Sequence, residues 1–264
     1  MLNFLRKIRR SLIQSGATSK YAIYAVGEIA LVVIGILIAL QINNWNEIRK
    51  SRESTKIYLQ AMIEDLNDDI AILKRLEENH LFRFYGLNYI LKYSGKSELD
   101  SVIPGWTPNR IWNEPIPNTY NKEFLKLSFT WFHRTGDLED YNSSSFEEMN
   151  NIGLFSFINN KPLKTSLKRY YKRWDWRLGP RQWQKENEWI EKWYEVLAQD
   201  GIYHNSLRDM TDPLSQIQIA KYPYREVILS NIRQYAAWRY NTSIILQEDA
   251  KGLINQIMEE IEKY

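Results

Sequence analysis

A long apolar run near the N-terminus constrains this chain more than any other feature. Residues 21–42 hold a single charged side chain, Glu28. A helix of about 20 apolar residues spans the hydrocarbon core of a bilayer. The run is longer than the apolar region of a cleaved signal peptide, and no A-x-A-like cleavage site follows it in "LQINNWNE". The sequence therefore predicts an uncleaved transmembrane helix over residues 21–42.

Charges on the two sides of this run predict its orientation. Residues 1–20 contain five basic residues and no acidic residue, whereas the far flank mixes glutamates with arginines and a lysine. The positive-inside rule then places residues 1–20 in the cytoplasm, as a basic amphipathic segment against the inner leaflet, and the rest of the chain outside. Three aromatic residues are expected to anchor the helix at the interfaces: Tyr21, Tyr24 and Trp45.

The position of Glu28 raises the question of what surrounds its carboxyl group. A carboxyl group at this depth costs a few kcal/mol and usually faces a protein interior. One helical seam combines it with mostly small residues: Ala25, Glu28, Val32, Gly35, Ala39 and Ile42. We predict that copies of the chain associate along this seam. Three arrangements stay open: a glutamate ring that handles protons or ions, a protonated glutamate bonded to a neighbouring helix or snorkelling, and a basic partner from another membrane protein.

Composition narrows the function classes further. A mean hydropathy of -0.49 excludes a protein with several membrane spans. A formal net charge of +3 over 264 residues gives little attraction for a polyanion, and we expect no nucleic-acid partner. The chain contains no cysteine, which excludes disulfide frameworks, thiolate metal sites and cysteine nucleophiles.

Residues beyond the apolar run follow a helical pattern almost throughout. We predict a stem helix over residues 43–93, an irregular Pro/Trp-rich loop over residues 94–118 and a helical extracytoplasmic domain over residues 119–264. The expected fold is all-α, with the transmembrane helix continuing into an antiparallel helical bundle. In the stem, an apolar face (Leu59, Ile63, Leu66, Ile70, Leu73) lies opposite an acidic face that we expect to be solvated (Glu64, Asp65, Asp68, Asp69).

Several segments carry a resemblance to a known family. They are "GEIALVVIGILIALQINNWNE" (residues 27–47), "YLQAMIEDLNDDI" (58–70), "INNKPLKTSLKRYY" (158–171) and "LINQIMEEIEKY" (253–264). With them the chain resembles an uncharacterised single-pass membrane protein family of Bacteroidota, described as a domain of unknown function. The resemblance implies an inner-membrane anchor with a helical periplasmic domain. It implies no activity, substrate or catalytic residue.

Motifs for catalysis or metal binding do not emerge from the sequence. The three histidines are His80, His133 and His204, and none has another histidine three or four residues away. The chain lacks the glycine-rich phosphate loops and the G-x-S-x-G nucleophile turn. We expect no enzyme activity, no metal and no cofactor. A membrane-tethered hydrolase would need a polar pocket around His133 or His204.

An aromatic and basic cluster in residues 168–195 is the most unusual feature outside the membrane run. In one interpretation its large rings fill a helical core while the arginines reach outward. That core would contain Tyr170, Trp174, Trp189 and Trp193. In the other, this cluster and the loop form a surface for a ligand or partner, such as a peptide, a lipid, a glycan or another membrane or periplasmic protein. The candidate surface residues are Trp106, Trp112, Trp174, Arg177 and Trp183.

Two functions fit these observations. The first is a membrane-anchored, self-associating interaction module that acts as a scaffold or sensor. The second is an oligomeric transport or gating component in which Glu28 handles protons or ions. Replacing Glu28 with glutamine separates them, because assembly and function without this carboxyl group would exclude the transport hypothesis.

Overall fold

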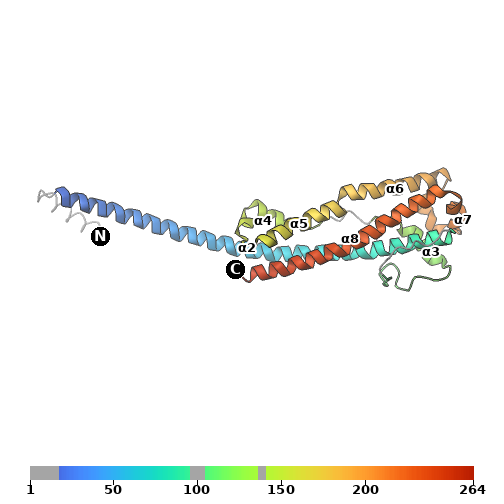
Figure 1. The fold of residues 1–264 in the computed structure, drawn as a ribbon, viewed down its shortest axis with the longest axis horizontal. Helices are drawn as coiled ribbons and strands as arrows, with labels where there is room; N and C mark the ends of the chain where they lie inside the picture. Colours follow the sequence, from blue (N-terminus) through green and yellow to red (C-terminus); the bar gives the residue numbers. More distant parts are fainter. Residues whose placement is uncertain (1–17, 96–104, 136–140) are drawn as a thin grey trace. The chain divides into compact units, whose positions relative to one another are not determined.

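The chain is helical throughout the parts that the structure describes. A computed structural model describes residues 18–95, 105–135 and 141–264. The predicted amphipathic segment therefore lies outside the described residues apart from residues 18–20. No strand occurs in these ranges, and the prediction of an all-α fold is confirmed. The helices (Figure 1) are α2 (Thr18–Tyr93), α3 (Lys122–Trp131), α4 (Ser144–Asn151), α5 (Lys161–Leu178), α6 (Pro180–Gln199), α7 (Pro213–Ile217) and α8 (Pro223–Ile261), with short 3₁₀ turns η1 (Leu154–Phe157), η2 (His204–Asp209) and η3 (Ile219–Lys221).

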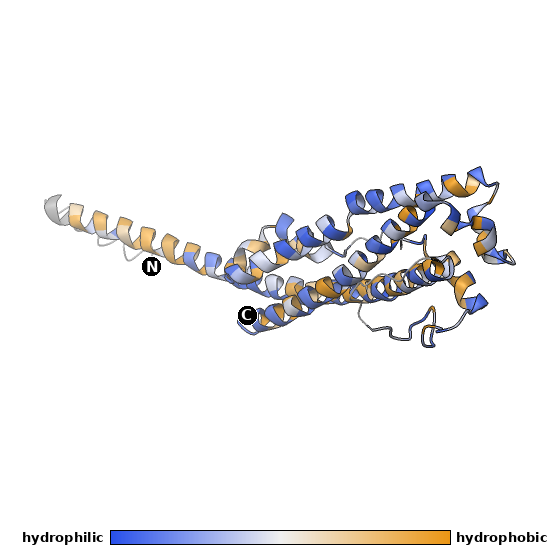
Figure 2. Ribbon diagram, turned by 45° about the vertical axis from the view of Figure 1, so that its right-hand side comes forward, coloured by the Kyte–Doolittle hydropathy of each residue, from blue (hydrophilic) through white to orange (hydrophobic). Residues whose placement is uncertain are grey.

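The chain divides into two compact units, residues 1–55 and residues 56–264. The described part of the first unit is the N-terminal portion of α2. It holds an 18-residue window with a mean hydropathy of 2.6, and none of that window is buried. In Figure 2 the ribbon of this stretch is mostly in the orange of hydrophobic residues. The helix is long and apolar enough to cross a membrane.

The second unit packs three long helical arms together. The stem part of α2 is one arm, α5 and α6 follow each other to form the second, and α8 is the third (Figure 1). Two contacts show that α8 runs antiparallel to α2, because Gln247 bonds Glu77 whereas Arg233 bonds Asn88. The α5–α6 arm runs in the same direction as α2. Helix α8 is therefore the arm that packs antiparallel to the other two.

Local sequence explains where the second arm begins and bends. Asn160 caps α5 because its side chain accepts a hydrogen bond from the backbone N–H of Leu163, and Pro162 lies in the first turn. Gly179 ends α5 and precedes α6. A Cβ on Gly179 would lie 2.3 Å from the carbonyl oxygen of Asp175. Glycine is therefore required at this junction, and Pro180 starts α6 because it needs no backbone donor there.

Two hydrophobic clusters fill the second unit. The first joins the stem from Leu59 to Leu76 with α4, α5 and the C-terminal half of α8. The second joins the stem beyond Phe82 with α3, α6, α7 and the N-terminal half of α8. Helix α3 approaches the stem closely at Gly86, where an added Cβ would lie 3.0 Å from the Ser128 Oγ. The two clusters do not share residues at the middle of the three arms, so this level of the second unit separates them.

The acidic face of the stem is only partly solvated, which corrects the prediction. Asp65 is 8% exposed and Asp69 is fully buried. Asp69 accepts hydrogen bonds from the backbone N–H of Asn142 (2.7 Å) and from the Tyr170 hydroxyl (2.8 Å). Asp65 accepts one from the N–H of Ser145 at 3.0 Å. The carboxylates face inward because N–H groups just before α4 and in its first turn need acceptors that α4 itself does not supply.

Asp69 is expected to make stability depend on pH. Burial raises its pKa to about 6, and the bonds from Asn142 and Tyr170 only partly oppose that shift. The folded state therefore binds this proton more tightly than the unfolded state, so the contribution is fully present below about pH 4 and is lost as the pH rises through about 6. Asp69→Asn removes the titration. Its stability relative to the wild type should increase by on the order of 2 kcal/mol between pH 4 and pH 7.5.

Urea unfolding of both proteins across this pH range measures the difference. Asp68→Asn is the matched control because Asp68 is exposed on the same helix. A stability difference between the Asp69→Asn variant and the wild type that stays constant with pH would contradict the role assigned to Asp69.

Candidate functional site

The predicted membrane seam lies on the exposed surface of the first unit. Glu28, Gly35 and Ala39 are exposed, Val32 is 55% exposed, and Ala25 is half-buried. A Cβ built on Gly35 would meet nothing within 4 Å. Within residues 18–95, 105–135 and 141–264, no residue therefore occupies the small-residue surface at Gly35.

The interface anchors are only partly described. Trp45 is 66% exposed, and the guanidinium of Arg49 lies 5.9 Å from the centre of its ring. Tyr24 is half-buried, and the side chain of Tyr21 lies outside the described residues. An exposed indole beside a basic residue at the end of an apolar run is the pattern found at membrane interfaces.

The loop tryptophans pack on their own unit. The Trp106 ring contacts Phe82 and Tyr85 at centroid distances of 6.3 and 5.3 Å, and its Nε1 donates to the carbonyl oxygen of Glu114. Trp112 contacts Phe124 at 5.1 Å. Residues 96–104 of this loop lie outside the described residues. In the described part, these two rings cover the stem and α3, which leaves little of them for a partner.

Trp174 is not a surface residue, which corrects its place among the candidate partner residues. It is 2% exposed and packs against Tyr170 and Tyr141. Its position on α5 repeats the apolar period, so the ring points into the core. Arg177 is half-buried and bonds Thr242 of α8, while the Nε1 of Trp183 donates to the Thr135 hydroxyl at 3.1 Å. The cluster is therefore mainly an interior, with Tyr170 and Trp193 buried and Trp189 half-buried.

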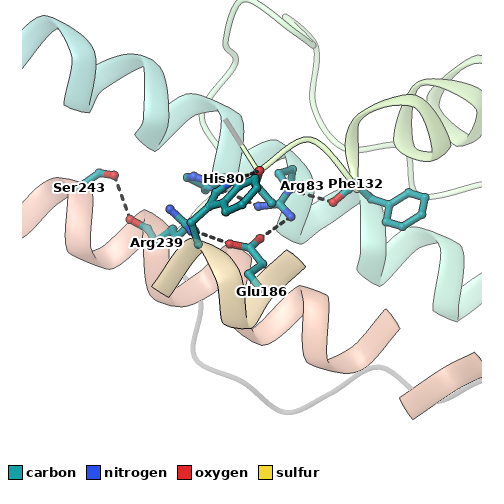
Figure 3. Close-up of polar contacts among 8 residues, drawn as sticks. His80, Arg83, Phe132, Glu186, Arg239 and Ser243 are labelled. Atoms are coloured by element: carbon teal, nitrogen blue, oxygen red, sulfur yellow. Dashed lines mark hydrogen bonds and ion pairs between the residues drawn. The ribbon is translucent and has the colours of Figure 1, made fainter. Parts of the chain in front are cut away.

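A buried charged cluster that sequence reasoning missed lies between the two hydrophobic clusters. Figure 3 shows Arg83 of the stem and Arg239 of α8 reaching the carboxylate of Glu186 from two sides. Arg83 donates from Nη2 to Glu186 Oε1 at 2.6 Å, and Arg239 donates from Nε to Glu186 Oε2. The side chains of Arg83 and Glu186 are 0% exposed, and that of Arg239 is 4% exposed. The charged cluster thus ties all three arms together at one level.

Two neighbouring groups complete the charged cluster. The Nε of Arg83 donates to the carbonyl oxygen of Phe132 at 2.9 Å, which holds the end of α3. The Nη1 of Arg83 lies 2.9 Å from Nδ1 of His80. Burial lowers the pKa of His80 well below its usual value, and Arg83 and Arg239 lower it further. His80 is therefore neutral, with Nδ1 as acceptor and the proton on Nε2.

This geometry favours a structural or binding role over proton transfer. Burial lowers the pKa of Arg83, and the attraction of Glu186 opposes that shift. Guanidinium groups stay protonated in proteins, so neither arginine is a proton donor. A buried charged layer inside a helical bundle is best known for fixing register.

One signal in the sequence could have located the charged cluster. Glu186 precedes Ile190, Trp193 and Leu197 at the helical spacing of a buried face, and Arg239 lies seven residues from both Ile232 and Leu246. A charged residue in an apolar position of a helix is the mark of a buried ion pair. The partners are 103 and 53 residues apart in the chain, so the pattern alone does not pair them.

His133 and His204, which the hydrolase hypothesis requires, come together. Their ring centroids are 6.0 Å apart, and Tyr194 lies 4.3 Å from His204. Burial lowers the pKa of His133 to about 4, with further contributions from His204 and Arg134. The described residues contain no group of three or more histidine, cysteine or acidic residues that could hold a metal ion. The surroundings of the pair include the ring of Tyr194 and the positive charge of Arg134, and this positive charge disfavours a bound cation.

Comparison with known proteins gives one similarity. A family of unknown function (DUF6090) matches residues 28–88, less than half of the chain. Neither the curated proteins nor the solved structures give a match. The matched segment contains Glu28, His80 and Arg83, but not Glu186 or Arg239. The match fits an uncharacterised domain that begins within the apolar run and ends in the stem.

Proposed function

We propose that this chain is a membrane-anchored helical interaction module that associates with copies of itself and serves as a scaffold or sensor. Its N-terminus lies in the cytoplasm, its helical unit lies outside the inner membrane, and it acts by binding rather than by catalysis. The observation that carries the proposal is the unburied 18-residue apolar window with Glu28 on its exposed surface. Lipid solvates the apolar side chains of that window, whereas the carboxyl group of Glu28 needs a polar neighbour.

Self-association is the arrangement that satisfies Glu28 with residues already in the chain. In the seam, Gly35 and Ala39 form a small-xxx-small pair that lets two helix backbones approach. A carboxyl group on one copy can then bond its equivalent on the next. Dispersion contacts along the helices add to this bond, because lipid gives no hydrophobic drive for helix pairing.

Gly35→Leu tests this seam directly. A Cβ added at Gly35 meets none of the described residues within 4 Å, so we expect the helix itself to tolerate the substitution. Between copies it separates the backbones, and association in nanodiscs should weaken about tenfold, which corresponds to about 1.4 kcal/mol. Single-molecule subunit counting at several protein-to-lipid ratios measures the change.

Gly27→Leu is the control for this experiment. Gly27 is also a helical glycine whose added Cβ would meet nothing within 4 Å, but it lies about 100° around the helix from Glu28. Equal effects of the two substitutions would count against the seam. A wild-type protein that stays monomeric at every ratio would overturn self-association altogether.

The same carboxyl group supports a second candidate function, an oligomeric transport or gating component. Glu28 is the only charged residue in residues 21–42, so it is the group in that segment that could carry a proton. Reconstituted vesicles with an internal pH dye test this candidate. Proton flux that disappears in Glu28→Gln while assembly persists would support it, and the absence of flux in the wild type would exclude it.

A further inference from the structure

The buried charged cluster carries an excess of positive charge. Arg83 and Arg239 share one carboxylate, Glu186, and His80 beside them is neutral. Among the described residues, two positive charges therefore face one negative charge in side chains that are at most 4% exposed. Leaving a net charge inside a protein costs several kcal/mol unless another group compensates it.

Two hydrogen-bond donors in the same cluster also have no acceptor in the described part of the chain. The Nη2 of Arg239 and the Nε2 of His80 are buried and bond no atom of the residues that the structure describes. The Nε2 carries the proton of His80 because Nδ1 faces the Arg83 donor. The large majority of buried side-chain polar atoms in proteins find a partner, and an unsatisfied one often marks a water or an ion. Both observations thus call for the same kind of ligand, a negatively charged acceptor.

We propose that the charged cluster binds a small monatomic anion, of which chloride is the common example, between His80 and Arg239. The anion accepts hydrogen bonds from Nη2 of Arg239 and Nε2 of His80, and its charge balances the second guanidinium. The two donors belong to α2 and α8 and lie beside Glu186 of α6 in side chains that are at most 4% exposed, and this burial favours a small ion over an oligophosphate or a sugar. A neutral water could accept hydrogen bonds from both donors, yet it would leave the excess charge uncompensated.

Anomalous diffraction from crystals of the full-length protein grown in bromide locates the anion. A bromide peak is expected within hydrogen-bonding distance of Arg239 Nη2 and His80 Nε2. A water molecule refined at that place, with no anomalous signal, would overturn the proposal. An unfilled site would overturn it as well. Bromide found only on the protein surface would count as an adventitious ion only.

Thermal unfolding of the detergent-solubilised full chain gives an independent readout. Chloride should raise the unfolding temperature by roughly 2–4 °C relative to gluconate at matched ionic strength. Arg239→Met leaves Arg83 and Glu186 as a balanced pair, so this variant should lose the chloride-specific shift. Arg173→Met is the control because Arg173 pairs with Asp249 and is 33% exposed. An equal chloride shift in the wild type and Arg239→Met would contradict the proposal.

Discussion

Replacing Glu186 with glutamine is expected to lower the free energy of unfolding by about 3–5 kcal/mol. The variant keeps the size of the side chain but leaves two buried guanidinium groups without a carboxylate. Their mutual repulsion in a site of low polarity then adds to the lost hydrogen bonds. Because these bonds join all three helical arms, the loss should appear as a lower urea midpoint for the whole second unit. Tryptophan fluorescence of the full-length protein measures it.

Glu188→Gln is the control for this prediction. Glu188 lies two residues further along α6 and is exposed, so its loss should change stability by less than about 0.5 kcal/mol. A combined Arg83→Met, Glu186→Leu and Arg239→Met variant should recover most of the stability, since an apolar layer needs no charge balance. If Glu186→Gln unfolds at the same urea concentration as the wild type, the three charges do not form a coupled layer.

Trp174→Ala should cost a comparable amount, about 3–5 kcal/mol. The ring is 2% exposed and fills the first hydrophobic cluster, where it contacts Tyr170 and Tyr141. Its removal leaves a large cavity that three packed helical arms cannot close. The measurement is again urea unfolding, followed by circular dichroism because a fluorophore has been removed.

Trp176 provides the matched control two residues away on α5. It is 61% exposed, so Trp176→Ala should leave stability within about 0.5 kcal/mol of the wild type. The pair also separates the two interpretations of the aromatic cluster. Equal small effects at both positions would mean that Trp174 lies at a surface and not in the core.

Local signals in the sequence account for much of the fold. Length and apolarity predicted a helix that can cross a membrane. The proline in the first turn of α5 and the "LGP" stretch at its junction with α6 are local signals of the same kind. Each of these features depends on residues within one or two turns of each other. Such features are readable because backbone geometry and hydrogen bonding act locally.

Features that depend on tertiary pairing could not be read in the same way. Asp65 and Asp69 look like part of a solvated helix face, yet they accept backbone N–H groups 80 and 73 residues further along the chain. The buried cluster of Arg83, Glu186 and Arg239 joins three arms that are distant in sequence. Only the folded arrangement shows which charged residues in apolar positions meet each other.

The return of α8 determines which end of the second unit the C-terminus reaches. Tyr264 donates from its hydroxyl to the carbonyl oxygen of Phe157, and Ile257 lies in the same hydrophobic cluster as Leu59, near the start of this unit. A fluorescent reporter fused after Tyr264 would therefore lie at the end of the second unit that contains Leu59 and Phe157. A reporter inserted near Gly201, at the opposite end of the arms, would sample a separate environment. Energy transfer between labels at these two places measures the distance between the two ends of the arms. It can therefore report whether that distance changes when a binding partner is added.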